Sequence, residues 1–217
     1  MTSPATESPA VTRPLMTRLK EDTRGAHDAA ESIPFMRDVM AGTLPREAFA
    51  ATLPQLKALR AGLEERVEKA AALSPEVAAA FQPHHKFSHL YDGDIAEFGA
   101  DASAPANPAV TQFLASLDAL IAEDPKSALG AFYVLEGSNM GAVMIRKRVA
   151  ESFGLVGDAG TAAMNPHGPA LRERWGQLVG TINGMNFDEA TQDRIVAAAD
   201  LTFRAVGDIH NEVYTGA

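Results

Sequence analysis

Gly130-Ala-Phe-Tyr-Val-Leu-Glu-Gly-Ser-Asn-Met-Gly-Ala142 is the most informative stretch of the chain. Leucine and methionine favour a helix here and no proline interrupts it, yet three glycines lie inside, and each costs about 1 kcal/mol relative to alanine. At about 100° per residue, Gly130, Gly137 and Gly141 fall within about 40° of one another around the helix. Such a bare stripe predicts close contact of the backbone with either another helix or a planar ligand.

A second group of residues, near the N-terminus, favours the ligand. Lys20, Arg24 and His27 are spaced at i, i+4 and i+7, so they share one face of a helix that we expect over residues 15–31. Two cations beside a nitrogen that ligates metals suit a molecule with carboxylates and an open metal position. Haem with its propionates fits that description, with His27 on one face of the iron and the glycine stripe over the other.

Composition limits the class of protein. The chain has 217 residues, which suits one domain, and no cysteine, which excludes disulfides, thiolate haem ligation and cysteine nucleophiles. Its 19 lysines and arginines against 28 aspartates and glutamates give a net charge of -9, which argues against binding to nucleic acid or to an anionic membrane surface. We see no apolar run of the roughly 20 residues that a membrane span needs, and we expect a cytoplasmic protein.

The pattern of apolar residues predicts an all-α, single-domain bundle, because sustained alternation of apolar and polar residues is missing. Residues 1–14 are polar and rich in serine, threonine and proline, which indicates a disordered tail before a domain at residues 15–217. The connection over residues 154–168 is the longest irregular one and is a candidate border of a ligand site. We expect helices at about 15–31, 34–41, 46–73, 75–82, 84–98, 109–123, 126–153, 169–184 and 187–214.

Four segments resemble the haem oxygenase family, in its bacterial biliverdin-forming branch. They occur in the family's order and read Leu19-Lys-Glu-Asp-Thr-Arg-Gly-Ala-His27, Glu31-Ser-Ile-Pro-Phe-Met36, Leu129-Gly-Ala-Phe-Tyr-Val-Leu-Glu-Gly-Ser-Asn-Met-Gly141 and Val196-Ala-Ala-Ala-Asp-Leu-Thr-Phe203. The resemblance spans about residues 15 to 214. It implies a helical bundle with haem held between a proximal helix and a kinked, glycine-containing distal helix.

The resemblance also implies an activity in which haem is both cofactor and substrate. The porphyrin would be cleaved at a meso carbon with O2 and external electrons, and the products would be biliverdin, carbon monoxide and ferrous iron. The protein must supply one axial nitrogen, a tight distal wall and ordered waters. The family implies a ferredoxin or a flavoprotein reductase as the electron donor, and we expect a monomer.

Carried over position by position, the resemblance makes His27 the proximal ligand of the iron. Gly137, Ser138 and Gly141 then form the catalytic distal wall, because a side chain at a glycine position there would occupy the oxygen site. Ser138 stands where some members of the family carry an aspartate that organises the water network.

Further residues complete the haem site that the resemblance implies. Lys20 and Arg24 approach the propionates, and Tyr133 hydrogen-bonds one of them. Phe203 packs against the edge of the porphyrin. The single tryptophan, Trp175, is expected in the core.

Two other functions stay open. A haem carrier or sensor on the same scaffold would bind haem without turnover, and its support is Ser138 together with a second helix that carries Arg60 in a stretch where tyrosines and a histidine are common. A haem-free enzyme with two metals needs inward-facing carboxylates and histidines from different helices. The candidates for that role are Glu64, His85, His89, Asp92 and Asp208. We expect His84, His85 and His89 to be solvated.

Overall fold

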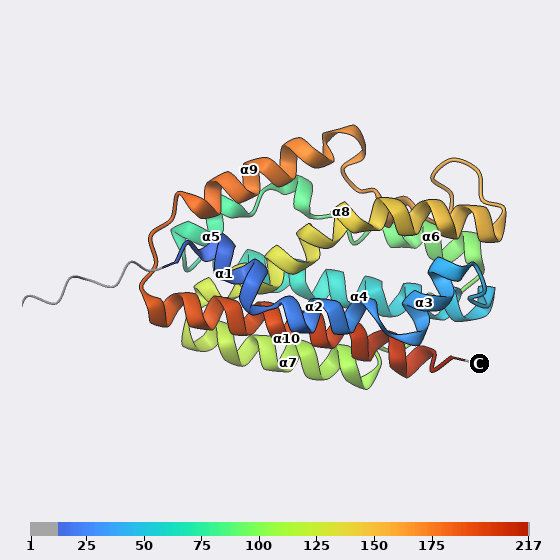
Figure 1. Cartoon of the computed structure of the whole chain (residues 1–217), viewed down its shortest axis with the longest axis horizontal. Coiled ribbons are helices and arrows are strands. Elements are labelled where there is room, and N and C mark those ends of the chain that lie inside the picture. The colour runs from blue at the N-terminus through green and yellow to red at the C-terminus, as the bar shows by residue number, and fades with distance from the viewer. Residues whose placement is uncertain (1–12, 217) are drawn as a thin grey trace, which may run out of the picture.

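The computed structural model describes residues 13–216, and the regular elements in that part of the chain are all helical (Figure 1). The α-helices are α1 (Leu15–Asp22), α2 (Arg24–Glu31), α3 (Pro34–Ala41), α4 (Arg46–Ala71), α5 (Pro75–Ala80), α6 (Leu90–Phe98), α7 (Pro108–Glu123), α8 (Ala128–Phe153), α9 (Leu171–Asn183) and α10 (Glu189–Val213). Short 3-10 turns lie between some of them, namely η1 (Pro83–His85), η2 (Pro125–Ser127), η3 (Ala162–Met164) and η4 (Gly168–Ala170). The all-α prediction is confirmed, and the predicted disordered tail lies, up to residue 12, outside the described residues.

The predicted helix over residues 15–31 is wrong in one respect, because the structure divides it into α1 and α2. Thr23 separates them with φ −99° and ψ 4°, and its buried hydroxyl donates a hydrogen bond to the carbonyl of Leu19. A threonine hydroxyl that bonds the preceding turn competes with the helix ladder. The spacing of Lys20, Arg24 and His27 therefore runs across two helices.

Local sequence explains where several helices begin. Ser74, Asn107 and Asp188 each precede a helix, and the side chain of each accepts a hydrogen bond from a backbone N–H in the first turn. The predicted helix over residues 84–98 starts only at Leu90, because Pro83 opens a 3-10 turn and the backbone N–H of Gln82 donates to Nδ1 of His85.

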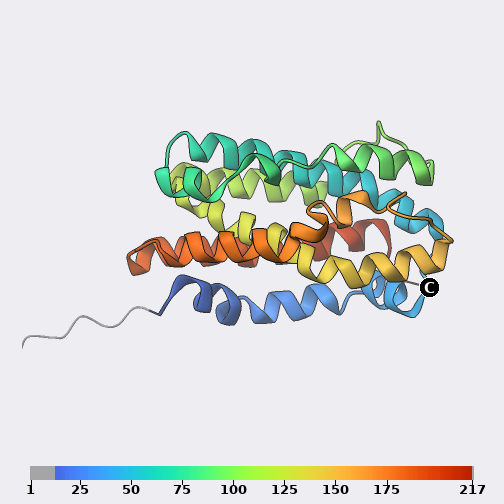
Figure 2. The same cartoon turned by 90° about the horizontal axis from the view of Figure 1, so that it is seen from above.

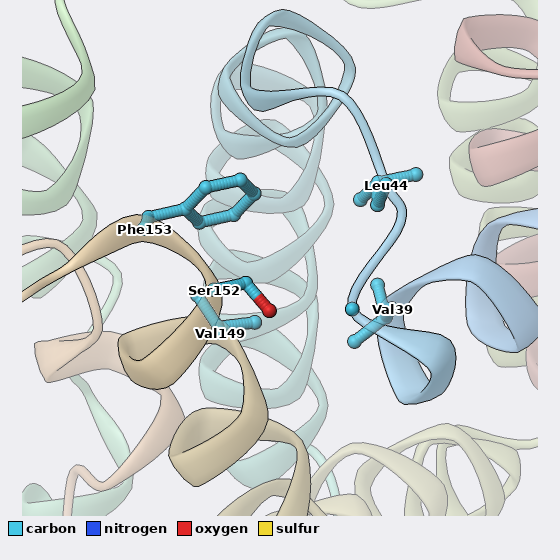
Figure 3. Close-up of a pocket in the computed structure, with 6 residues that line it drawn as sticks. Val39, Leu44, Val149, Ser152 and Phe153 are labelled. Carbon is cyan, nitrogen blue, oxygen red and sulfur yellow. The ribbon is translucent and has the colours of Figure 1, made fainter.

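The end of α3 is fixed by a glycine. Gly42 follows α3 with φ 75°, a left-handed conformation that L side chains rarely adopt. A Cβ built on Gly42 would lie 3.3 Å from Oγ of Ser152 in α8. Figure 3 shows this junction, where Val39 and Leu44 around the turn face the C-terminal end of α8.

The core is built around α8 and α10, which pack against each other and against α4 and α7. Seen from above in Figure 2, α1 and α2 run along one side of the molecule, α8 and α9 occupy the middle, and α4 and α6 lie on the other side. A second apolar cluster joins α3, α4 and α6 to the C-terminal half of α8. The helix α8 is continuous from Ala128 to Phe153, and the kink that the resemblance implies in it stays a prediction.

One segment of the described residues is long and apolar enough to span a membrane by length and composition, namely Pro125–Phe153. The expectation that the chain has no such run is therefore wrong. Of the apolar window in this segment, 44% is buried inside the protein. Since α8 packs against α4, α9 and α10 within the bundle, the same composition also serves a core helix.

Candidate functional site

A cavity of about 570 Å³ lies between α2 and α8. This volume falls within the roughly 300–1,000 Å³ of small-molecule sites in proteins. Its walls also come from α3, α4, α6 and α10, and most of the side chains that line it are apolar. The predicted border at residues 154–168 is confirmed in part, since Ala163 and Met164 reach the cavity from that connection. The site therefore suits a large, mainly apolar ligand.

His27 lines one wall of the cavity, as predicted for a proximal ligand. Its imidazole is 47% exposed, with Nε2 3.5 Å from Oε1 of Glu31 and Nδ1 3.4 Å from Oδ1 of Asp28. Phe203 of α10 meets the imidazole edge-on, at 5.3 Å between ring centroids. A carboxylate beside a histidine orients the ring and raises its basicity as a ligand. The imidazole is thus accessible from the cavity and lies beside the carboxylates of Asp28 and Glu31.

The opposite wall is formed by residues 137–142 of α8, which include the predicted distal residues Gly137, Ser138 and Gly141. A Cβ built on Gly141 would meet no atom within 4 Å, whereas a Cβ on Gly137 would lie 3.1 Å from Cη2 of Trp175. The Ser138 hydroxyl donates a 3.0 Å hydrogen bond to the carbonyl of Leu135. This stretch therefore has open backbone at Gly141, beside the side chains of Met140 and Ala142, which also line the cavity.

Gly130 does not belong to the distal wall, so the prediction of one continuous stripe over the ligand is wrong there. It lies outside the cavity lining, and a Cβ built on it would lie 1.9 Å from the carbonyl oxygen of Ile195 in α10. Its role is close packing of α8 on α10. The stripe thus divides along its length between a helix partner and a ligand surface.

Of the three residues predicted to contact the propionates, one lines the cavity and two do not. Tyr133 lines the cavity, and burial raises the pKa of its hydroxyl. Lys20 and Arg24 are exposed and do not line the cavity, so their contact with propionates stays a prediction. Phe203 lines the cavity beside His27.

Trp175 is predicted in the core, and the structure places it at the edge of the core cluster, where it also forms part of the cavity wall. It is partly buried, packs against the core cluster, and lies 5.6 Å from Tyr133 between ring centroids. As the single tryptophan of the chain, it reports on the cavity by its fluorescence.

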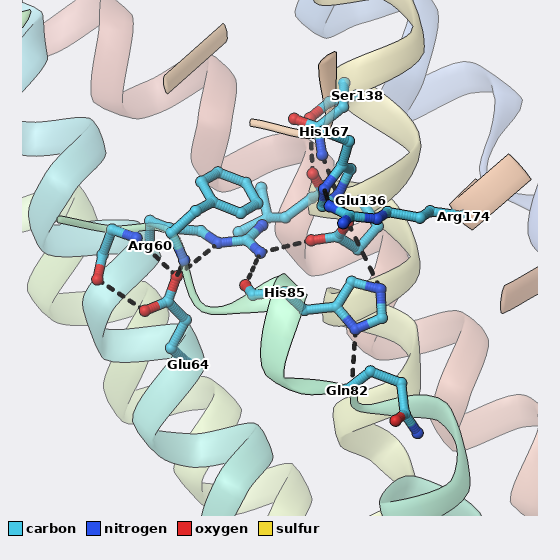
Figure 4. A network of polar contacts seen from close by, with 12 residues as sticks. Arg60, Glu64, Gln82, His85, Glu136, Ser138, His167 and Arg174 are labelled. Carbon is cyan, nitrogen blue, oxygen red and sulfur yellow. Dashed lines mark hydrogen bonds and ion pairs between the residues drawn. The ribbon is translucent and has the colours of Figure 1, made fainter. Parts of the chain in front are cut away.

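A network of buried charges joins α4, α8, α9 and the connection before α9, and the sequence did not predict it (Figure 4). Arg60 of α4 donates to Glu64 on its own helix and to Glu136 of α8. The second carboxylate oxygen of Glu136 lies 2.9 Å from Nε2 of His167, and Nη1 of Arg174 lies 2.9 Å from Nδ1 of the same ring. The only sequence signal was the Arg60 and Glu64 pair at i, i+4.

Contacts in this network fix the charge of Glu136. Burial alone would raise the pKa of this carboxyl, but the hydrogen bond from His167 and the positive charge of Arg60 hold it below its ordinary value. Since an arginine only donates, Nδ1 of His167 must accept from Arg174, and Nε2 then carries the proton that it donates to Glu136. Glu136 is therefore an ionised buried acceptor.

Two more polar side chains line the cavity on the α6 side. Tyr91 reaches it, and burial raises the pKa of its hydroxyl to about 12. Asp94 also lines the cavity and accepts hydrogen bonds from the backbone N–H groups of Ala162 and Ala163. Burial raises the pKa of Asp94 against these bonds. Tyr91 was not singled out from the sequence.

The residues nominated for a two-metal site are not brought together. Glu64 is occupied by Arg60 and by Ser88, Asp92 pairs with Lys57 at the surface, and no group of three or more His, Cys, Asp or Glu side chains within residues 13–216 is arranged to hold a metal. His85 was expected to be solvated and is instead buried, at 2% exposure. The remaining candidates, His89 and Asp208, are exposed.

Burial of His85 predicts a pH dependence of stability. Burial lowers the pKa of His85 to about 4, against the opposing effect of the Glu136 carboxylate. Between about pH 6.5 and pH 4 the unfolded chain binds a proton that the folded chain does not, so the free energy of unfolding should fall as the pH falls, by at most about 3 kcal/mol. Denaturant unfolding across this window measures the slope.

The matched variants for this measurement are His85→Asn and His89→Asn. The first removes the titrating ring, while its side-chain oxygen can still accept from the backbone N–H of Gln82. We expect a flatter profile for His85→Asn and the wild-type profile for His89→Asn, because His89 is exposed. An equal slope in all three proteins would contradict the assignment to His85.

The family model for haem oxygenase matches residues 13–212. No curated protein matches the chain.

Solved structures give the same fold. Haem oxygenase-2 from Synechocystis sp. PCC 6803, in complex with haem and NO, superposes with a TM-score of 0.82 at 20% identity, covering 92% of this chain and 85% of that one. Haem oxygenase from Leptospira interrogans superposes with a TM-score of 0.83 at 20% identity, covering 92% and 99%. A domain of unknown function with this fold, from Shewanella denitrificans, gives 0.77 at 14% identity, covering 94% and 93%. At these identities the superpositions establish the fold.

Proposed function

This chain belongs to the haem oxygenase family, and we propose that it binds haem as its substrate and cleaves it oxidatively to biliverdin, carbon monoxide and ferrous iron. The observation that carries the proposal is the cavity itself. It has an accessible imidazole, His27, on one wall and open backbone at Gly141 on the other. A flat macrocycle with one open axial position fits between two such walls.

Haem meets the requirements of these residues. His27 would ligate the iron through the imidazole, and Glu31, one helical turn further on, would hold the ring in place. Phe203 would pack against the edge of the macrocycle. When bound, haem supplies both the iron that reacts with O2 and the porphyrin that is cleaved.

The distal wall would control what reaches the reacting centre. Backbone at Gly141 lets the macrocycle approach α8 closely, and the open space there leaves room for a small molecule or water. Ser138 is neutral, so the ionised groups that lie nearest to this wall belong to the Arg60 and Glu136 network. The apolar lining elsewhere excludes bulk water and strengthens every electrostatic contact inside.

Partners of the reaction belong to the same proposal. Electrons would come from an external ferredoxin or flavoprotein reductase, and the propionates would extend toward the cations Lys20 and Arg24 and the hydroxyl of Tyr133. A cytoplasmic monomer is the form that we propose. Support for the propionate contacts rests on Tyr133, which lines the cavity.

A hemin titration of the purified protein tests this function. We expect a Soret band that saturates at one haem per chain, together with quenching of Trp175 fluorescence, because Trp175 lines the cavity. Ascorbate under air should then convert the Soret band into a bilin band. A Soret band that is stable under reductant and air would instead indicate a haem carrier or sensor. If the titration gives no Soret band and no quenching, haem binding is refuted.

A further inference from the structure

Arg60 places a guanidinium in the cavity wall with one nitrogen unused. Its side chain is only 4% exposed, yet Arg60 lines the cavity. Nε donates to Oε1 of Glu64 at 3.1 Å, and Nη2 donates to Glu136 and to the backbone carbonyl of His85. Nη1 is buried and has no hydrogen-bond partner among the described residues. A buried donor without a partner is unfavourable unless a ligand or water completes it.

The plane of this guanidinium is fixed on several sides. Glu64 and Glu136 hold two of its nitrogens, and the ring of Phe87 stacks against it, with Cζ 3.6 Å from the ring centroid. Glu64 is itself held by the backbone N–H groups of Phe87 and Ser88. The guanidinium therefore cannot turn Nη1 toward either carboxylate without breaking bonds already made.

A second tier of contacts fixes the carboxylate of Glu136. His167 donates to it from Nε2 at 2.9 Å, and Arg174 holds the far side of the imidazole (Figure 4). Asn139, which lines the cavity, adds a long contact of 3.5 Å from Nδ2. Charges that are buried and hydrogen-bonded in this way are held in one arrangement. The direction of Arg60 thus depends on groups from α8, α9 and the connection before α9.

We propose that Arg60 is the distal hydrogen-bond donor of this site, and that its Nη1 donates to the water or small oxygen-containing molecule held between haem and α8. The inference rests on the proposed function, and it assigns a role that Ser138 cannot fill alone, because the Ser138 hydroxyl is neutral and bonded to Leu135. Tyr91, whose hydroxyl stays protonated at neutral pH, lies on the same cavity wall and can share the water.

The chemistry explains why a fixed cation suits this position. Reduction of oxygen builds negative charge on the oxygen atoms, and a preorganised donor in a water-poor site stabilises that charge. An arginine keeps its proton, so Arg60 would hold and orient the molecule while protons arrive through water. Glu136 and His167 act as positioning residues, since they touch Arg60 and each other rather than the cavity molecule.

The test is Arg60→Lys, with Arg66→Lys as the matched control. Lysine keeps the positive charge that Glu64 and Glu136 require, but its three N–H donors cannot serve Glu64, Glu136, the carbonyl of His85 and a cavity molecule at the same time. Arg66 lies on the same helix, bonds Asp118 at the surface and does not line the cavity. A double variant, Arg60→Met with Glu136→Gln, removes this ion pair together, while Glu64 keeps its hydrogen bonds from the backbone N–H groups of Phe87 and Ser88.

Two readouts that do not depend on turnover decide the outcome, namely the azide affinity of the ferric haem complex and the C–O stretching frequency of the ferrous carbonyl complex. We expect azide affinity to fall at least about tenfold in Arg60→Lys and in the double variant, with a higher C–O frequency, and neither change in Arg66→Lys. Wild-type azide affinity and C–O frequency in both Arg60 variants, each with one haem bound, would overturn this inference and leave the proposed function intact. A wild-type protein without a Soret band would overturn the proposed function and this inference with it.

Discussion

Replacement of His27 by alanine should reduce haem turnover on the order of a hundredfold or more, since changing even the outer partner of a metal ligand costs roughly 10–100-fold. The Soret band should shift or be lost, because the imidazole is the one accessible nitrogen that we assign to the iron. Overall stability should change by less than about 0.5 kcal/mol, because the side chain is 47% exposed and lies on the surface of α2.

Lost turnover and a changed Soret band at unchanged stability would show that His27→Ala loses a ligand of the iron and keeps the fold. Added imidazole should restore part of the band in His27→Ala, because a free ring can occupy the space that the substitution leaves beside Phe203. His89→Ala is the control, since His89 is also exposed but does not line the cavity. Turnover and spectrum near wild type in His27→Ala would show that another group ligates the iron, and the assignment of the proximal wall would be wrong.

Gly130→Ala should lower the free energy of unfolding by about 3 kcal/mol, whereas Gly141→Ala should raise it by about 0.5–1 kcal/mol in the haem-free protein. The added methyl at Gly130 would lie 1.9 Å from the carbonyl oxygen of Ile195 and 2.9 Å from the backbone nitrogen of Ala199, so α8 and α10 would have to separate. At Gly141 the methyl meets no atom within 4 Å, and the helix gains the higher propensity of alanine.

The two variants control for each other, because they carry the same substitution in the same helix. Thermal unfolding should show a fall of roughly 6–12 °C for Gly130→Ala and a small rise for Gly141→Ala, at the roughly 2–4 °C per kcal/mol expected for a chain of this size. Equal shifts in the same direction would mean that helix propensity alone governs both positions. In that case α8 and α10 would not depend on the close approach at Gly130.

The glycine segment shows how far a sequence pattern reaches. Periodicity correctly predicts that Gly130, Gly137 and Gly141 share one stripe, and both partners considered for it occur: a helix at Gly130 and an open cavity wall at Gly141. The pattern does not predict which positions along the 26-residue helix face another helix and which face the cavity. That depends on where α9 and α10 cross α8, which is a property of the packed bundle.

In the N-terminal segment, a prediction from residue spacing failed because the helix is broken. The spacing of Lys20, Arg24 and His27 predicted one shared face, and the break at Thr23 divides it, because a hydroxyl bond to Leu19 ends α1. His27 keeps its place on the cavity wall, while the two cations lie outside it. A local hydrogen bond of one buried side chain was enough to undo a geometric inference made over two turns.

By itself the sequence determined the helical class, the segment with the accessible histidine and the bare stretch of α8, because these follow from patterns within single helices. The tertiary structure alone decided the buried network, since Arg60 and Glu136 are 76 residues apart and Glu136 and His167 are 31 apart. No local pattern links residues from α4, α8 and the connection before α9. Their ionised side chains are tolerated in the interior only because the fold brings compensating partners within hydrogen-bond distance.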